Sequence, residues 1–191
     1  TISITRAIQL ELLKNKEFHG DLLDYGGGDN AQYRKYIKSE SYSSANIDSN
    51  IRPTWVISIG EKIPCNDLTF ENVLSLNTLE HVYNTKDVLK ELYRVLKNNG
   101  EICISTPFMF GIHGHPDDFF RPTPSWYQKS LSSVGFRDVK VLTLSVGPFS
   151  TGASCSGLPG PAKVFRMRCA IVLDYIYHYS RRLLGKKDIS S

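Results

Sequence analysis

The densest group of reactive side chains begins at His113, where two histidines, two aspartates and an arginine share one short segment. Histidine is the usual general base near neutral pH, so His113 and His115 are candidate catalytic bases, with Asp117 as the partner that orients an imidazole. Arg121 is a candidate for holding an anionic group of a substrate. We expect Phe108, at the start of the same loop, to help cover the site and exclude water.

Two other interpretations of this segment stay open. In a purely structural one, Asp117 and Asp118 cap turns and pair with Arg121. In the other, a divalent ion is held by His113, His115 and an aspartate, but no spacing here is diagnostic of a metal ion. We therefore expect catalysis by a base and assign no metal ligands from the sequence.

A second candidate site is the glycine turn Gly26-Gly27-Gly28, which follows a short apolar run. Glycine lets the backbone turn sharply and approach a ligand closely, and a helix that starts near residue 29 would offer free N–H groups. Asp48, expected at the end of the next strand, can accept both hydroxyls of a ribose. Because the spacing to Ala31 also fits a dinucleotide-binding turn, the glycines alone do not identify a cofactor.

Both candidate sites need a framework of alternating strands and helices. The periodicity predicts strands over 21–25, 44–48, 54–59, 72–77, 101–106 and 139–144, and helices over 5–18, 30–38, 85–96 and from 123 onward. This alternation predicts an α/β fold with a doubly wound, mostly parallel sheet of six or seven strands and helices on both faces. In such sheets, ligands bind beyond the carboxyl ends of the strands, where both sites fall.

Composition divides the chain into three parts. Residues 1–146 form the expected ligand-binding domain, 147–161 are a linker rich in Gly, Ser and Pro, and 162–191 are a basic amphipathic segment. From Pro161 onward, seven basic and two acidic residues give +5, so the total of +4 leaves −1 for the rest of the chain. A helix over 162–184 can lie on an anionic membrane, pack within the protein or form a dimer; a seventh strand over 164–173 is the alternative.

The same arithmetic excludes some classes of function. A globular part with net charge −1 is not a basic nucleic-acid binder. The four cysteines are scattered without metal-ligand spacing, which is typical of reduced thiols in a cytoplasmic protein. The sequence carries no run long enough to span a bilayer, so any membrane contact is expected to be peripheral, at the inner membrane surface. Nothing in the sequence fixes the oligomeric state.

Several short motifs flank the glycine turn. One acidic residue, Asp24, precedes it, and three motifs follow it in order: Ile63-Pro64, Leu79-Glu80-His81-Val82 and the run 94–101. Over about residues 21–141, this succession resembles the class I S-adenosylmethionine-dependent methyltransferases. The resemblance implies S-adenosylmethionine as the cofactor, because dinucleotide-binding folds usually have an apolar residue at the position of Asp24.

The resemblance also implies a role for each cofactor-binding position. Asn30 and Ile59 depart from the family pattern, which has a third glycine and an adenine-binding acid there; Glu61 is a possible substitute for that acid. The implied contacts are Gly26 and Gly28 with the amino-acid part, Asp24 with its ammonium group, Asp48 with the ribose, Gly60, Glu61 and Ile63 with the adenine, and Asn77 with the methionine moiety.

The segment 113–123 resembles a loop in methyltransferases associated with surface-polysaccharide and other glycan biosynthesis. The expected function is therefore O-methylation of a sugar or glycan intermediate, with His113 or His115 taking the hydroxyl proton. Methylation of another small metabolite and a non-catalytic cofactor-binding or partner-binding role remain alternatives. A dehydrogenase is disfavoured by Asp24. Methylation of DNA amino groups is disfavoured because residues 77–80 lack the Asn/Asp-Pro-Pro-aromatic motif.

Overall fold

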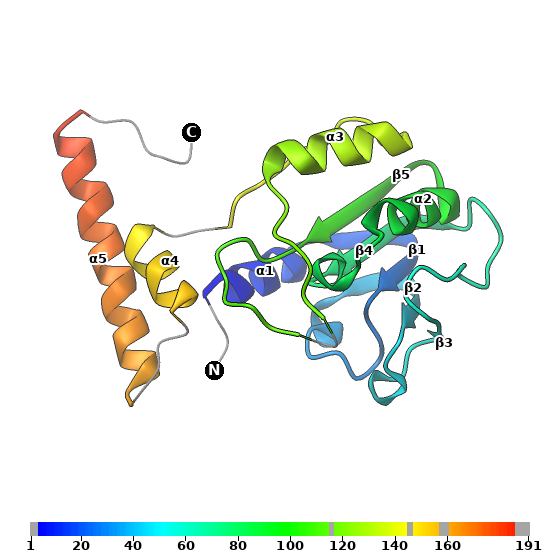
Figure 1. The fold of residues 1–191 in the computed structure, drawn as a ribbon, viewed down its shortest axis with the longest axis horizontal. Helices are drawn as coiled ribbons and strands as arrows, with labels where there is room; N and C mark the ends of the chain where they lie inside the picture. Colours follow the sequence, from blue (N-terminus) through cyan, green and yellow to red (C-terminus); the bar gives the residue numbers. More distant parts are fainter. Residues whose placement is uncertain (1–3, 115–116, 145–146, 157–160, 186–191) are drawn as a thin grey trace. The chain divides into compact units, whose positions relative to one another are not determined.

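The computed structural model describes residues 4–114, 117–144, 147–156 and 161–185 (Figure 1). They form two compact units. One comprises residues 10–108 and 113–141, and the other comprises the described residues of 1–9, 109–112 and 142–191. The first unit holds the sheet, with strands β1 (Glu17–Tyr25), β2 (Lys38–Asn46), β3 (Trp55–Val56), β4 (Phe70–Leu76) and β5 (Leu96–Ser105), and helices α2 (Thr85–Val95) and α3 (Pro124–Val134).

The five strands are all parallel, in the order β3-β2-β1-β4-β5. The predicted doubly wound parallel sheet is therefore confirmed, but the described residues contain one or two strands fewer than expected. The run 139–144, predicted as a sixth strand, pairs with no described strand. It is divided between the two units at residue 142, and Leu142 is 78% exposed, so the run does not extend the sheet.

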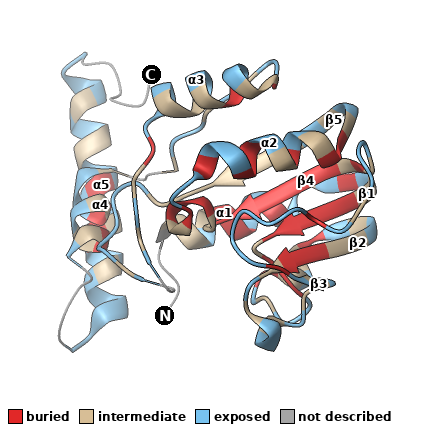
Figure 2. Cartoon of the chain, turned by 45° about the vertical axis from the view of Figure 1, so that its right-hand side comes forward, coloured by how far each residue is buried: buried red, intermediate tan, exposed pale blue. Residues whose placement is uncertain are grey.

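Successive residues of the central strands face opposite sides of the sheet, because side chains alternate along a strand. Leu22 and Leu74 face one side, where they pack with the second half of α1 (Ile4–Lys14). Leu23 and Val73 face the other side, which α2 and α3 cover, as Figure 2 shows for α2. Burial on both faces explains why the centres of β1 and β4 are consecutive apolar pairs, Leu22-Leu23 and Val73-Leu74.

The helix predicted over 30–38 is wrong. Residues 29–37 form turns and a short 3₁₀ helix, η1 (Arg34–Tyr36), and β2 begins directly afterwards at Lys38. The backbone N–H groups of Asp29 and Asn30 donate to the carbonyls of Arg52 and Ile51, at 3.2 and 2.9 Å. These donors are therefore engaged with a distant segment and do not form the free helix N-terminus that the sequence suggested.

The second unit contains α4 (Pro148–Cys155) and α5 (Lys163–Leu183). Asp174 of α5 is fully buried and accepts hydrogen bonds from the backbone N–H groups of Phe149 and Ser150, at 2.8 and 2.9 Å. A carboxylate at this position satisfies donors that a helix N-terminus leaves without partners. The segment predicted as a linker thus contains a helix, and the alternative strand over 164–173 is replaced by α5. None of the described helices has the length and apolarity required to cross a membrane.

Candidate active site

The glycine turn directly follows β1 and lies against the segment after β4. Gly26 has φ +93°, a conformation that side chains rarely adopt, and its N–H donates to Ala45 of β2 at 2.8 Å. A Cβ at Gly26 would lie 2.0 Å from the Thr78 hydroxyl oxygen. Only glycine therefore allows β1 to turn at this point while the residues after β4 approach so closely.

A pocket opens at the carboxyl ends of β1 to β4, as the topological rule for parallel sheets predicts. Two of the predicted cofactor residues, Gly26 and Asn77, line it. Asn77 has φ +54°, a left-handed conformation that asparagine tolerates better than most residues, and its N–H donates to Ser105 of β5 at 2.7 Å. The lining comprises Tyr25, Gly26, Ala45, Asn46, Ile47, Ile57, Ser58, Ile59, Asn77, Thr78, His81 and Val82.

Asp24 lies beneath the glycine turn and outside this lining. Its side chain is fully buried and accepts hydrogen bonds from the hydroxyls of Tyr33 and Tyr42, at 3.2 and 2.8 Å. Burial, together with the Asp24 charge, raises the pKa of Tyr42, so this phenol stays a donor. A Cβ at Gly27 would meet the Asp24 carboxylate at 1.8 Å. Asp24 thus braces the turn, and contact with an ammonium group remains a prediction.

At the end of β2, the structure places Asn46 on the pocket and Asp48 two residues beyond it. The Asn46 amide donates to the Gly26 carbonyl at 2.5 Å, and its side-chain oxygen accepts from the Asp48 N–H at 2.9 Å. The Asp48 carboxylate accepts from the backbone N–H of Asn50 and caps the 3₁₀ helix η2 (Ser49–Ile51). Gly28 is close-packed on the same helix, since a Cβ there would lie 2.3 Å from the Ile51 carbonyl oxygen.

The segment after β3 forms the apolar wall of the pocket through Ile57 and Ile59. Gly60, Glu61 and Ile63, which the sequence assigned to adenine, do not line it. Glu61 instead accepts a hydrogen bond from the Ser58 N–H at 2.7 Å, and Ile63 is fully buried in the core.

This segment is fixed by an ion pair on α2. Arg94 and Glu91 form a two-pronged pair, with nitrogen–oxygen distances of 2.8 and 2.6 Å. Glu91 also accepts from the Ile63 N–H at 2.7 Å, and Arg94 donates to the carbonyls of Ile63 and Cys65, both at 3.1 Å. Because charge-assisted pairs are strong and directional, this pair holds the backbone of the loop in place.

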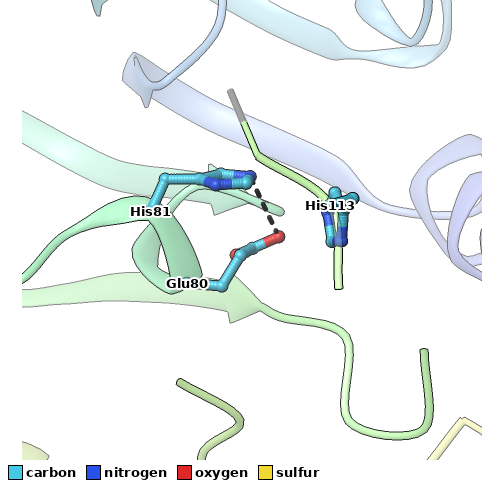
Figure 3. A group of neighbouring side chains, drawn as sticks. All are labelled: Glu80, His81 and His113. Carbon is cyan, nitrogen blue, oxygen red and sulfur yellow. Dashed lines mark ion pairs between the residues drawn. The ribbon is translucent and has the colours of Figure 1, made fainter. Parts of the chain in front are cut away.

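A second group of polar side chains adjoins the pocket through His81, which lines it. Figure 3 shows the Glu80 carboxylate and the His81 imidazole pointing toward each other, with the His113 ring beside them. The Glu80 oxygen lies 3.7 Å from His81 Nε2, and the two imidazole centroids are 5.3 Å apart. Glu80 and His81 come from the 3₁₀ helix η3 (Leu79–His81) that follows β4, and His113 comes from the loop after β5.

Glu80 is fully buried, and neither carboxylate oxygen accepts a hydrogen bond from the described residues. Burial raises the pKa of Glu80 to about 7, although the charges of His113 and Arg121 lower it. In the sequence, Glu80 and His81 belong to one motif of the family resemblance and carry no assigned catalytic or binding role. The one local signal was an acidic residue beside Leu79 and close to Val82, both buried; the neighbour from the β5 loop is visible only in three dimensions.

The segment 113–121, which carries the predicted catalytic residues, has different partners from those predicted. Asp117 contributes its backbone carbonyl to His81 Nδ1, whereas Asp118 is the carboxylate beside His113, 3.4 Å from its Nδ1 and accepting its backbone N–H at 2.9 Å. Arg121 forms a two-pronged pair with Asp118, one contact being 2.6 Å, which holds the pKa of that carboxyl well below its usual range. The Arg121–Asp118 pair is the one expected in the purely structural interpretation of this segment. Phe108 is 52% exposed, and His115 lies outside the described residues.

Residues 23–104 match the family described as a methyltransferase domain. Over this part of the chain the sequence is similar to a methyltransferase domain, and S-adenosylmethionine is the cofactor that this similarity supports. The match covers the glycine turn, the pocket, Glu80 and His81, and ends in β5. A comparison with curated proteins finds no match for this chain.

Solved structures share the fold of this methyltransferase domain at low sequence identity. YcgJ of Bacillus subtilis has a TM-score of 0.54 and 14% identity, with 67% of this chain and 68% of that chain covered. A possible histamine N-methyltransferase of Thermotoga maritima has a TM-score of 0.53 and 16% identity, covering 68% and 70%. Phosphoethanolamine N-methyltransferase 2 of Haemonchus contortus, solved with S-adenosylmethionine, has a TM-score of 0.53 and 16% identity, covering 72% of this chain and 39% of that chain.

The pocket suits S-adenosylmethionine in the chemistry of its lining. Ile57 and Ile59 offer an apolar wall for the flat adenine, and the amides of Asn46 and Asn77 offer donors and acceptors for the polar parts. Gly26 lets the backbone approach. Among the described residues, the lining holds no carboxylate, contrary to the expectation for Asp48, and the ribose would meet Asn46 first.

Proposed function

We propose that the methyltransferase domain transfers a methyl group to a hydroxyl oxygen of a small acceptor, and that this acceptor is a sugar or glycan intermediate. The observation that carries the proposal is the Glu80–His81–His113 cluster, which adjoins the cofactor pocket through His81. A hydroxyl is a weak nucleophile, and its methylation releases a proton. Groups that bind the hydroxyl and withdraw its proton are therefore needed at this edge of the pocket.

The residues of this chain divide the work between them. When bound, S-adenosylmethionine supplies an electrophilic methyl group. The pocket wall would hold the cofactor in a fixed position, and the Arg94–Glu91 pair stabilises the loop that continues from this wall. A fixed position is needed because in-line displacement requires the methyl group and the acceptor oxygen to be aligned. His81 is oriented by the Asp117 carbonyl and His113 is oriented by Asp118. The hydroxyl proton passes to an imidazole of this cluster, while the bound cofactor would supply the methyl group to the acceptor oxygen.

Two exposed aromatic rings beside the cluster support a sugar acceptor. Tyr83 and Phe119 pack edge to face with centroids 5.5 Å apart, and they remain 79% and 46% exposed. The Phe119 N–H donates to the Glu80 carbonyl at 2.8 Å, which ties this ring to the cluster. A sugar presents hydroxyls to polar groups and a carbon–hydrogen face to aromatic rings. A polar cluster beside two aromatic rings therefore fits a sugar better than it fits a purely apolar acceptor.

The C-terminal helix supports an acceptor carried on a membrane lipid. Phe165 and Ile176 of α5 are 68% and 59% exposed, and the basic residues of the sequence are concentrated in the same segment. A basic amphipathic helix of this kind can lie at an anionic membrane surface. We propose that α5 brings this cytoplasmic enzyme to the inner membrane surface, where enzyme and lipid-linked glycan would meet.

The test is a methyl-transfer assay with labelled S-adenosylmethionine and matched acceptors. Each sugar is paired with the analogue that lacks one hydroxyl, and simple amines form a third set. We expect the label in sugars, lost with the removal of a single hydroxyl. His113→Ala should lower turnover by roughly 10²–10⁴-fold, whereas the exposed His19→Ala should not change it. Labelled amines without labelled sugars would overturn the proposal.

A further inference from the structure

We propose that Glu80, His81 and His113 bind a divalent transition-metal ion. One ligand atom from each residue lies within 4.8 Å of the others. The set consists of two imidazoles and one carboxylate, drawn from η3 and from the loop after β5. This donor set is one that proteins use for zinc and for non-haem iron, with coordination positions left open for other ligands.

The first observation behind this proposal is the burial of Glu80. Its side chain is wholly inaccessible, and neither carboxylate oxygen accepts a hydrogen bond from any residue in the described part of the chain. A buried carboxylate without hydrogen bonds carries a large desolvation cost. Arg121, the nearby guanidinium, already forms a two-pronged pair with Asp118. A cation held between Glu80 and the histidines would balance this charge.

The second observation is the tautomer of His81. Its Nδ1 contacts the backbone carbonyl oxygen of Asp117, and a carbonyl oxygen only accepts hydrogen bonds. Nδ1 must therefore carry the proton, and in the neutral ring Nε2 presents a lone pair. This Nε2 lies 3.7 Å from the Glu80 carboxylate, so the protonated ring pairs with that carboxylate and the neutral ring leaves a lone pair available to a metal ion beside it. A carbonyl that fixes the distal nitrogen is a common arrangement behind metal-bound histidines.

His113 has a comparable outer partner and the freedom to complete the site. The Asp118 carboxylate lies 3.4 Å from His113 Nδ1, while the Asp118 side chain itself is 4% exposed and held by Arg121. Ligands about 2.1 Å from one ion lie at most about 4.2 Å apart, so the three side chains must close slightly around it. The His113 side chain is 37% exposed and has room for that movement.

Such an ion would serve the reaction without redox chemistry. A divalent ion lowers the pKa of a bound hydroxyl and fixes its oxygen in place, so the proton would pass to water and not to the ligating imidazoles, whose lone pairs the ion occupies. Because His81 also lines the cofactor pocket, the open coordination positions would be available to the acceptor at its edge. This role in catalysis rests on the proposed function, whereas the metal binding itself does not.

The test measures metal binding on the full chain, without cofactor or acceptor. The protein is stripped with a chelator, dialysed and titrated calorimetrically with Zn²⁺, and Co²⁺ spectra report the ligand type. We expect one site per chain, weakened at least tenfold by Glu80→Gln and by His113→Ala, but not by His19→Ala. His113→Ala alters a half-exposed side chain, so it remains informative where Glu80→Gln impairs folding.

Three results would overturn the metal site: no Zn²⁺ binding, equal affinity in the wild type and His113→Ala, or a thiolate-to-cobalt band that shows ligation by cysteine. The methyl-transfer assay is a separate readout. Metal binding without methylation of any hydroxyl would leave the site standing and refute the proposed function. Full methylation by metal-free protein would refute the ion's catalytic role, leaving the hydroxyl acceptor in place.

Discussion

The hydroxyl of Tyr42 donates a 2.8 Å hydrogen bond to the fully buried carboxylate of Asp24, directly beneath the glycine turn. The turn that shapes the cofactor pocket therefore rests on a buried anion whose charge is stabilised by tyrosine hydroxyls. Removal of one donor leaves that anion less well compensated, which costs more than a surface hydrogen bond would.

We predict that Tyr42→Phe lowers the free energy of unfolding by about 1–3 kcal/mol. The change removes only the hydroxyl, so the ring still packs against β1. Urea denaturation followed by circular dichroism measures the effect. The control is Tyr83→Phe, because Tyr83 is 79% exposed. Equal stability of the two variants would mean that the Tyr42 hydroxyl does not support the Asp24 carboxylate.

The second prediction separates Asn46 from Asp48 as the ribose-binding residue. Asn46 lines the pocket, whereas the Asp48 carboxylate caps η2. We expect Asn46→Ala to weaken S-adenosylhomocysteine binding by roughly 1–3 kcal/mol and Asp48→Ala to weaken it by less than half as much. Isothermal calorimetry with both variants decides this. A larger loss for Asp48→Ala would restore the assignment made from the family resemblance.

The Arg94–Glu91 pair should stabilise the protein above the pKa of glutamate and lose that effect in acid. Burial alone would raise the pKa of Glu91, but hydrogen bonds from Arg94 and the Ile63 N–H outweigh it and lower the pKa below the ordinary value. A lowered pKa in the folded state means that the stabilisation is present above about pH 4.3 and disappears as the pH falls through the folded-state pKa.

We therefore expect Glu91→Gln to lower the melting temperature at pH 7, with a free-energy cost of roughly 1–3 kcal/mol, and to do so much less at pH 3. Thermal melts at both pH values measure the difference. Lys90→Gln is the control, since its pair with Asp87 is exposed and worth little. A deficit that is the same at both pH values would show that the loss comes from packing rather than from the charged pair.

The fourth prediction concerns α5 and anionic membranes. Each basic residue near such a surface contributes about 1 kcal/mol. Replacing two exposed basic residues of α5, in Lys163→Gln/Arg168→Gln, should reduce co-sedimentation with anionic vesicles at least tenfold. The control, Lys35→Gln/Lys86→Gln, removes the same charge from the other unit. Negligible binding of the wild-type chain, or equal loss in both double variants, would contradict a specific role of α5.

The parallel sheet could be predicted because its information is local. The runs 21–25 and 72–76 each have an apolar pair at the centre, and the residues that follow them, Gly26 and Asn77, lie at the carboxyl edge of the sheet. The start of β2 could not be predicted in this way. Lys38 to Ser44 is rich in polar residues, and its outer neighbour β3 pairs with only two of its residues, so most of β2 needs no apolar character.

The Glu80–His81–His113 cluster was harder to predict, because His113 is distant in sequence from the other two residues and no spacing joins them. Glu80 and His81 come from one motif, and His113 comes from a loop that folds back over it. The sequence identified His113 but paired it with Asp117, whereas the neighbouring Asp118 fills that position. Adjacent carboxylates differ only in which way the backbone directs them, and the sequence of this loop does not determine that direction.

The most direct test of where the cofactor binds is a crystal structure of the full chain with S-adenosylhomocysteine. We predict one molecule in the pocket at the ends of β1 to β4, in contact with Gly26, Asn46 and Asn77, and adjoining the Glu80–His81–His113 cluster. S-adenosylhomocysteine bound at another place, or a pocket that remains solvent-filled at saturating concentration, would contradict the central claim that this pocket brings the cofactor to that cluster.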